Sequence, residues 1–211
     1  MAGIEFYTNP MSRSQIIRWM LEEVGEPYEE HILTYGPEMK SDAYLAINPM
    51  GKVPAIRHDG KVVTECAAIC AYLAEAFLEK GLAPKPEERA DYYRWMFFAA
   101  GPVEQAITAN TMGWVPEGPQ KEGTVGFGSY ERTVNAFETA FDGKDFAAGD
   151  RFTAADVYVG SQIIWGLQFG TLPKKPGFEA YAARLTDRPA YLKAKARDGE
   201  LIAAMQAAEA N

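Results

Sequence analysis

The segment that decides the fold of the first part of the chain runs from Ile4 to Val24 and reads IEFYTNPMSRSQIIRWMLEEV. It starts with a short strand-like run, Ile4 to Tyr7, which the turn residues Asn9 and Pro10 interrupt. Apolar residues then recur on one helical face, namely Ile16, Ile17, Met20, Leu21 and Val24. Gly25 is typical of the residue that follows the end of a helix. A strand followed directly by an amphipathic helix predicts an α/β domain.

The same alternation of strands and helices continues to about residue 80. A hairpin with a glycine-containing turn is predicted at His58-Asp59-Gly60. An alanine-rich helix is predicted from Glu65 to Leu78. The remaining predicted elements are a strand at Tyr28–Leu33, a short helix at about Asp42–Ile47, and the two hairpin strands at Val53–Ile56 and Lys61–Thr64. The order β-α-β-α-β-β-α predicts one α/β domain with a mixed sheet at residues 1–80.

The second part of the chain has only helical patterns. Residues 81–88 contain Pro84 and Pro86 and are predicted to be a short, fairly stiff linker. Residues 89–211 are predicted to be an all-helical domain, with helices at about 87–111 (interrupted at Gly101-Pro102), 129–141, and from 153, 177 and 189. The helix from Thr153 has a capping box with Asp156, and the uncharged stretch that follows predicts a buried core helix.

Composition and charge exclude several classes of function. The chain has 211 residues and a formal net charge of −8, which disfavours binding to nucleic acid or to an anionic membrane. Its two cysteines cannot form a disulfide framework, and its two histidines are too few for a common zinc site. No segment reaches the roughly 18 apolar residues that span a bilayer, and no signal peptide is visible. We therefore expect a soluble cytoplasmic protein without a metal.

Three short segments contain candidate functional residues. The first is Asn9-Pro-Met-Ser12-Arg-Ser14, where a hydroxyl at a helix start is suited to stabilise a bound anion. The more conservative interpretation is that Ser12 only caps the helix, and the local sequence favours it. The second is Lys52-Val53-Pro54, where a trans proline opening a strand is the commoner arrangement and a cis bond would turn the backbone of Val53 outward.

The third segment is Glu65-Cys66 at the start of the alanine-rich helix. Exposed N–H groups in the first turn of a helix suit a ligand carboxylate, and the side chain of Glu65 suits an ammonium group. Two simpler interpretations are that Glu65 complements the helix dipole and that Cys66 is a core cysteine. A helix start also lowers the pKa of a thiol, so a redox role for Cys66 stays open. Cys70 is predicted to be a core cysteine.

Together these segments resemble the cytosolic glutathione transferase family. The resemblance covers the whole chain and is supported by the Phe152-Thr-Ala-Ala-Asp156 motif, which is similar to the capping motif of the family's helical domain. The segment Trp19 to Tyr28 is similar to the family's passage from the first helix to the second strand. The resemblance implies a thioredoxin-like first domain followed by an all-helical domain. It also implies a homodimer that takes reduced glutathione as co-substrate, with no tightly bound cofactor.

The family's site residues can be carried over to matching positions. The resemblance implies that Ser12 is the catalytic serine and ranks it above Tyr7, Ser14 and Arg13. It implies that Val53, next to a cis Pro54, pairs with the cysteinyl part of glutathione. The other implied contacts are Glu65 and Cys66 with the γ-glutamyl end, and Lys40 and Lys52 with the glycyl carboxylate. Many members have serine where this chain has Cys66.

The implied reaction is attack of the glutathione thiolate on a small hydrophobic electrophile held by the helical domain. Candidate residues for that pocket are Phe97, Phe98, Met112 and Trp114, although the helix-bundle core is the favoured interpretation for all except Trp114. Two alternatives remain. One is a glutathione-dependent thiol reductase or peroxidase that uses Cys66, and the other is a non-catalytic glutathione-binding stress protein.

Overall fold

A computed structural model of the chain describes residues 3–209. Among these residues, positions 3–80 and 187–209 form one compact unit, and Gly81–Thr186 form a second. The two units are described separately below. Within residues 3–209, no helix is both long enough and apolar enough to cross a membrane.

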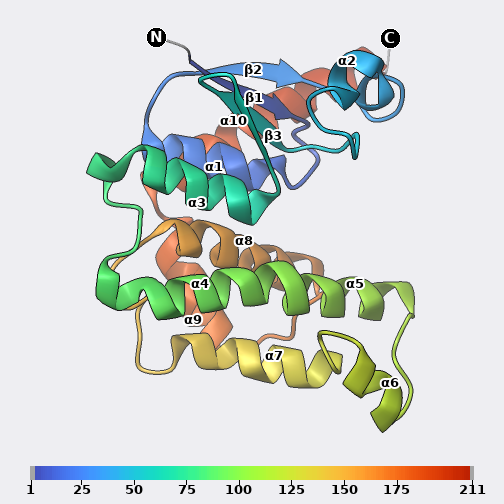
Figure 1. The fold of residues 1–211 in the computed structure, drawn as a ribbon, viewed down its shortest axis with the longest axis vertical. Coiled ribbons are helices and arrows are strands. Elements are labelled where there is room, and N and C mark those ends of the chain that lie inside the picture. The colour runs from blue at the N-terminus through green and yellow to red at the C-terminus, as the bar shows by residue number, and fades with distance from the viewer. Residues whose placement is uncertain (1–2, 210–211) are drawn as a thin grey trace. The chain divides into compact units, whose positions relative to one another are not determined.

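The first unit is built on a four-stranded mixed sheet with the strand order β2-β1-β3-β4 (Figure 1). Strand β1 (Ile4–Thr8) pairs in parallel with β2 (Tyr28–Ile32) and antiparallel with β3 (Ala55–His58), and β3 pairs antiparallel with β4 (Lys61–Thr64). The helices are α1 (Ser14–Val24), the short α2 (Asp42–Leu45) and α3 (Cys66–Ala76), with a 3-10 turn at Glu38–Lys40. The predicted order β-α-β-α-β-β-α is confirmed.

The two faces of β1 differ in what they bury. The side chain of Phe6 is fully buried, and the guanidinium carbon of Arg18 in α1 lies 5.3 Å from the centre of its ring. The apolar residues predicted for α1 are also buried. The side chain of Tyr7 points to the opposite face and packs with Met39, Tyr44 and Ala55. This alternation follows from the two-residue period of a strand. Residues 9–13 then connect the end of β1 to the start of α1.

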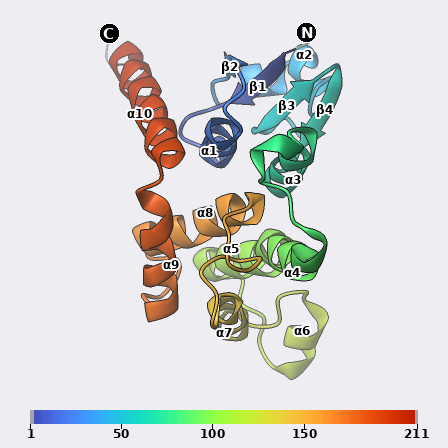
Figure 2. The same cartoon turned by 90° about the vertical axis from the view of Figure 1, so that its left-hand side faces the viewer.

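The last helix, α10 (Pro189–Glu209), packs against α1 and belongs to the first unit (Figure 2). The sequence analysis grouped residues 189–209 with the helical domain, because every periodic segment after residue 88 is helical. Periodicity shows that a helix has an apolar face but does not show which element that face contacts. Here the contacts include the rings of Trp19 and Tyr191, whose centroids are 5.0 Å apart in an edge-to-face arrangement.

The second unit contains only helices and turns, apart from one isolated β-bridge between Phe146 and Gly149. The predicted interruption at Gly101-Pro102 is confirmed and takes the form of a π-helical turn, Ala99–Val103. The sequence analysis missed one short helix, α6, in a segment that reads as a loop because of its glycine and proline residues. The helices are α4 (Arg89–Phe98), α5 (Glu104–Met112), α6 (Pro119–Thr124), α7 (Tyr130–Glu138), α8 (Ala154–Phe169) and α9 (Pro176–Thr186).

Helix α8 is the core helix of the second unit, as predicted. The capping box of Thr153 and Asp156 is present, and Asp156 Oδ2 accepts the N–H of Thr153 at 2.8 Å. The other carboxylate oxygen of Asp156 accepts the N–H of Ala147 at 2.7 Å and the hydroxyl of Tyr181 at 2.6 Å. Because this carboxyl group is fully buried, it would destabilise the fold if its oxygen atoms had no hydrogen-bond donors, and these bonds supply the donors. Asp156 thus joins the start of α8 to the loop that contains Ala147 and to Tyr181 of α9.

Candidate functional site

The loop between β1 and α1 contains the first group of predicted site residues. The Oγ of Ser12 is half-buried and accepts a hydrogen bond from the N–H of Ser14, the first residue of α1, at 3.0 Å. The hydroxyl of Ser12 lies 2.7 Å from the carbonyl oxygen of Asn9, to which it donates, and 2.8 Å from Ser14 Oγ. Arg13, not Ser12, is the N-cap residue of α1, so the interpretation of Ser12 as the cap is wrong, although its Oγ accepts the first N–H of the helix. The hydroxyl proton of Ser12 is able to turn.

Asn9 keeps this loop in place through its backbone and its side chain. The N–H of Ser12 donates to the carbonyl oxygen of Asn9 at 3.1 Å, so that oxygen keeps a donor even when the Ser12 hydroxyl turns away. The amide of Asn9 donates to the carbonyl oxygen of Leu33 at 2.8 Å and accepts the N–H of Met11 at 2.9 Å. Asn9 is fully buried and thus ties the end of β1 to the end of β2.

Tyr7, Ser14 and Arg13 are the lower-ranked alternatives to Ser12. Arg13 is the exposed residue just before α1. The side chain of Ser14 is fully buried beneath Ser12, so it can support Ser12 but does not face solvent. The hydroxyl of Tyr7 donates to Glu5 Oε2 at 2.7 Å, toward the beginning of β1 and away from the Ser12 loop. Burial and this bond to the Glu5 carboxylate raise the pKa of Tyr7 to about 12. Of these three hydroxyl groups, that of Ser12 alone belongs to a partly exposed residue beside the start of α1.

The loop before β3 contains the second group. The Val53–Pro54 peptide bond is cis. Two donors hold the carbonyl oxygen of Lys52 just before it, the hydroxyl of Tyr44 and the side-chain amide of Asn48, each at 2.7 Å. The side chain of Lys52 is exposed. The backbone just before Val53 is therefore held by two buried polar side chains, whose roles the sequence analysis did not foresee.

Lys40 fixes the turn that precedes Lys52. Its ammonium group donates to the carbonyl oxygens of Met50 at 3.1 Å and Gly51 at 3.0 Å, and so uses two of its three N–H groups. Gly51 has a φ of +57°, and a Cβ at this position would lie 2.5 Å from the carbonyl oxygen of Met39. A side chain at position 51 would therefore push apart the turn and the segment that contains Lys40.

The start of α3 contains the third group. Glu65 is exposed and lies just before the helix, not within its first turn as predicted, and its backbone has the unusual angles φ 67° and ψ 120°. Non-glycine residues rarely adopt such a conformation, and those that do are often found where a ligand binds. Cys66 is half-buried, and its Sγ lies 3.8 Å from the carbonyl oxygen of Arg13.

The contact of Cys66 with Arg13 brings the first and third groups together, since Arg13 adjoins Ser12. Cys70 is fully buried, as predicted, and burial raises the pKa of its thiol well above the usual value. The core interpretation of Cys66, in contrast, is wrong because its side chain is partly accessible. Among residues 3–209, no cluster of three or more His, Cys, Asp or Glu side chains is suited to hold a metal ion.

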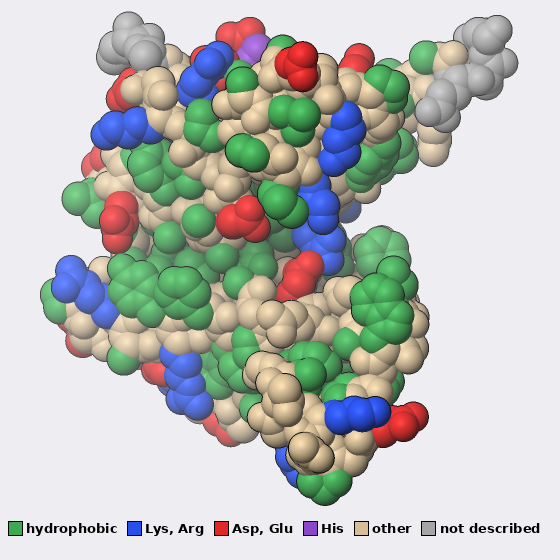
Figure 3. Space-filling model, turned by 45° about the vertical axis from the view of Figure 1, so that its right-hand side comes forward, with side chains coloured by type: hydrophobic (Ala, Val, Ile, Leu, Met, Phe, Trp, Pro, Cys, Tyr) green, Lys and Arg blue, Asp and Glu red, His purple; other side chains and the backbone are tan. Residues whose placement is uncertain are grey.

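The candidate electrophile-pocket residues belong to the second unit. Phe97, Met112 and Trp114 are 68%, 58% and 67% exposed, so the interpretation of Phe97 and Met112 as helix-bundle core is wrong. Phe98 is half-buried and packs against Trp95 and Phe137, as expected for a core residue. Figure 3 shows large hydrophobic side chains at the surface of this unit. They are accessible to an apolar ligand.

Comparison with known proteins finds a matching family model and similar sequences. Residues 10–76 match the family model described as "Glutathione S-transferase, N-terminal domain". The chain is 29% identical over 182 residues to "Glutathione S-transferase GstB" of Escherichia coli strain K12, covering 82% of this chain and 88% of that protein.

Solved structures of similar fold match a larger share of the chain. A glutathione transferase from Methylococcus capsulatus strain Bath is 27% identical, with a TM-score of 0.75 and coverage of 93% of this chain and 98% of that chain. A theta class glutathione S-transferase from Xanthomonas axonopodis pv. citri, solved with glutathione bound, is 25% identical. Its TM-score is 0.69, and the match covers 92% of this chain and 97% of that chain.

Proposed function

The chain belongs to the cytosolic glutathione transferase family, and we propose that it activates the thiol of reduced glutathione for attack on small hydrophobic electrophiles. The observation that carries this proposal is the arrangement of Ser12. Its Oγ is held by a backbone N–H at the start of α1, and its proton can turn toward a ligand. The related structure from Xanthomonas axonopodis pv. citri, which has glutathione bound, supports glutathione as the ligand.

The reaction we propose needs only a stabilised thiolate. The glutathione thiol gives its proton to solvent, and the Ser12 hydroxyl turns from the carbonyl oxygen of Asn9 to donate to the thiolate sulfur. The sulfur then forms a bond to an electrophilic carbon. The electron pair that this bond displaces goes to a leaving group, or to a conjugated acceptor that is protonated by water. The carbonyl oxygen of Asn9 retains the N–H of Ser12 throughout.

The free energies involved are of the right size. A thiol with a pKa of about 8.5 is only about 3% ionised at pH 7, and lowering that pKa by about 2 units requires about 2.7 kcal/mol. A hydrogen bond from Ser12 to a charged acceptor supplies about 1.5–3 kcal/mol. The dipole of α1 supplies about 0.3–1 kcal/mol more. The two contributions together cover the requirement.

The remaining groups would bind the rest of glutathione. We assign the backbone of Val53, next to cis Pro54, to the cysteinyl part, and Lys40 and Lys52 to the glycyl carboxylate. At the start of α3, the backbone N–H of Cys66 would bind the γ-glutamyl carboxylate and Glu65 the ammonium group. The unusual backbone of Glu65 supports a ligand at this position.

The second unit would supply the contacts with the electrophile. We assign this role to Phe97, Met112 and Trp114, because they are large apolar side chains with high exposure. We also expect a cytoplasmic homodimer, as in the family. Light scattering of the purified chain measures its oligomeric state.

The experiment that tests the proposal compares the wild type with Ser12→Ala in glutathione conjugation to a panel of hydrophobic electrophiles. Ser12→Ala is expected to lower kcat/KM at pH 6.5 by about 10-fold to 100-fold, since it removes about 1.5–3 kcal/mol of thiolate stabilisation. Ser12→Thr, which keeps the hydroxyl, is the matched control and is expected to retain more activity. Full activity of Ser12→Ala from pH 6 to pH 8 would rule out this catalytic assignment. Glutathione binding without any turnover by the wild type would favour the non-catalytic alternative.

A further inference from the structure

Helix α10 and Arg188, the residue just before it, form hydrogen bonds and ion pairs with several turns of α1. Near the end of α1, Arg188 donates to both carboxylate oxygens of Glu23, at 2.7 and 2.8 Å. In the middle of α1, the fully buried guanidinium of Arg18 donates to Asp198 Oδ1 at 2.7 Å. These contacts hold α10 in a defined register against α1. Each side chain of α10 that faces α1 therefore contacts one particular turn of α1.

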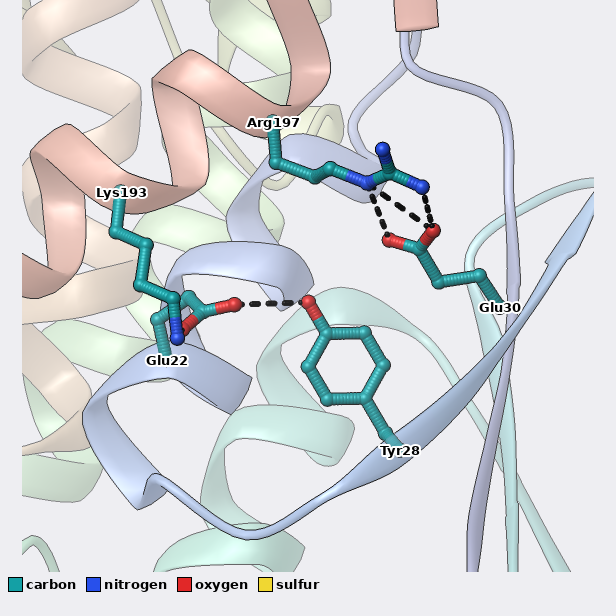
Figure 4. A pocket seen from close by; sticks show the side chains of 5 residues that line it. All are labelled: Glu22, Tyr28, Glu30, Lys193 and Arg197. Atoms are coloured by element: carbon teal, nitrogen blue, oxygen red, sulfur yellow. Dashed lines mark hydrogen bonds and ion pairs between the residues drawn. The ribbon is translucent and has the colours of Figure 1, made fainter. Parts of the chain in front are cut away.

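Two lysines of α10, Lys193 and Lys195, contact opposite ends of α1. The ammonium group of Lys193 forms an ion pair of 2.6 Å with Glu22, close to the end of α1. Figure 4 shows this pair beside Tyr28, and Arg197 reaching Glu30 at the other side of the same pocket. The ammonium group of Lys195, in contrast, donates at 3.0 Å to the side-chain oxygen of Gln15, in the first turn of α1.

Gln15 contacts both Lys195 and the loop that contains Ser12. Its side-chain N–H donates to the carbonyl oxygen of Pro10 at 2.6 Å. Pro10 has no N–H group, so this carbonyl is the only backbone polar group of Pro10 that can be held. The residue lies two positions before Ser12. Lys195, Gln15 and Pro10 thus connect a helix 180 residues away in the sequence to the loop that carries the proposed catalytic hydroxyl.

We propose that Lys195 is a positioning residue for thiolate activation, acting through Gln15 on the Pro10–Arg13 loop; this rests on the proposed role of Ser12. The positively charged ammonium group of Lys195 donates to the Gln15 oxygen and so polarises the amide. This polarisation strengthens the hydrogen bond that the Gln15 side-chain N–H donates to the carbonyl oxygen of Pro10. The loop is then held so that the Ser12 hydroxyl needs only to turn, without moving its Cα, to reach a thiolate. Small displacements of such a donor weaken stabilisation of the charged acceptor.

The test compares Lys195→Met with Lys193→Met. Both substitutions remove an ammonium group of α10 and keep an aliphatic side chain, but only Lys195 is linked to the Ser12 loop. Ultraviolet absorbance of the bound thiolate against pH gives the pKa of the glutathione thiol in each complex. Lys195→Met is expected to lower the thiolate fraction and kcat at pH 6 by about 3-fold to 10-fold, with KM for glutathione within about 2-fold. The rate is expected to return to the wild-type value at high pH.

Two controls make the result specific. Lys193→Met is expected to keep the wild-type thiol pKa, and Lys195→Arg is expected to restore most of it. Wild-type thiolate titration in Lys195→Met would overturn the proposal, and so would an equal effect in Lys193→Met, because that would reflect docking of α10 in general.

Amide hydrogen exchange of residues 11–15 without glutathione is a second measurement. Lys195→Met is expected to speed it several-fold and Lys193→Met is not, and equal exchange in both would overturn the proposal. If Lys195→Met speeds exchange but the wild type binds no glutathione, the proposed function fails while the structural link from Lys195 to the loop stands.

Discussion

The Sγ of Cys66 lies 3.8 Å from the carbonyl oxygen of Arg13, so the starts of α1 and α3 meet although they are 53 positions apart in the sequence. Arg13 follows Ser12, and Cys66 follows Glu65. This contact places the proposed thiolate-stabilising hydroxyl and the proposed γ-glutamyl contacts at the same end of the sheet. One tripeptide would be able to reach both, which is what activation of glutathione requires.

The thiol of Cys66 is not needed for conjugation if Ser12 activates glutathione. Cys66→Ser is expected to keep kcat/KM within about 3-fold, because the backbone N–H at this position is unchanged and a serine hydroxyl forms a normal hydrogen bond to a nearby carbonyl. The measurement is glutathione conjugation together with glutathione-dependent disulfide and peroxide reduction. Loss of the reductase activity alone would instead support the thiol reductase alternative.

Ser14 supports Ser12 from below. When the Ser12 hydroxyl turns to a thiolate, the buried Ser14 hydroxyl is the group that can donate to Ser12 Oγ, 2.8 Å away. Ser14→Ala is expected to lower kcat/KM at pH 6.5 by about 3-fold to 10-fold, corresponding to about 0.5–1.5 kcal/mol for one neutral hydrogen bond. The effect should be smaller than that of Ser12→Ala. An effect of Ser14→Ala that exceeds it would make Ser14 the primary hydroxyl.

Tyr7 is expected to be dispensable for activity. Its hydroxyl is bonded to Glu5 at 2.7 Å, and its pKa is raised to about 12, so it neither faces the Ser12 loop nor ionises near neutral pH. Tyr7→Phe is expected to keep kcat/KM within about 2-fold and to lower the free energy of unfolding by about 1 kcal/mol. The measurements are conjugation kinetics and urea unfolding. A loss of activity similar to that of Ser12→Ala would show that the tyrosine takes part after all.

The carboxylate of Glu5 predicts a pH dependence of stability. Hydrogen bonds from Arg57 and then from Tyr7 lower the pKa of Glu5 from 4.5 to about 2. A carboxyl whose pKa is lower in the folded state stabilises the fold above its unfolded pKa, and that stabilisation is lost as pH falls from about 4.5 to about 2. Arg57→Met is therefore expected to be less stable than the wild type at pH 7. The two free energies of unfolding should converge as pH approaches 2, whereas a constant difference between them would contradict this account.

How far the sequence predicts the site depends on how local each feature is. The turns that contain Ser12 and the Val53-Pro54 pair could be predicted from the local sequence, because turn residues and helix starts depend on neighbours in the chain. The roles of these residues and the cis bond were implied only by the resemblance to the family. The supporting roles of Asn9, Tyr44 and Asn48 were missed, because each acts through a hydrogen bond to a backbone carbonyl outside its own turn or in another loop. A buried asparagine next to a proline gives no signal in the sequence of which carbonyl it will bind.

The sequence by itself determined the order of strands and helices from Ile4 to Ala76, the capping box of Thr153 and Asp156, and the absence of the positive charge that a polyanion binder needs. These are set by propensity, periodicity and net charge, which act over a few residues or over the whole composition. Only the tertiary structure decided that α10 packs on α1, that the Tyr7 hydroxyl points away from Ser12, and that Lys195 reaches Gln15. The physical reason is that each of these depends on which surfaces become buried against each other, and many pairings of apolar faces satisfy the same sequence pattern.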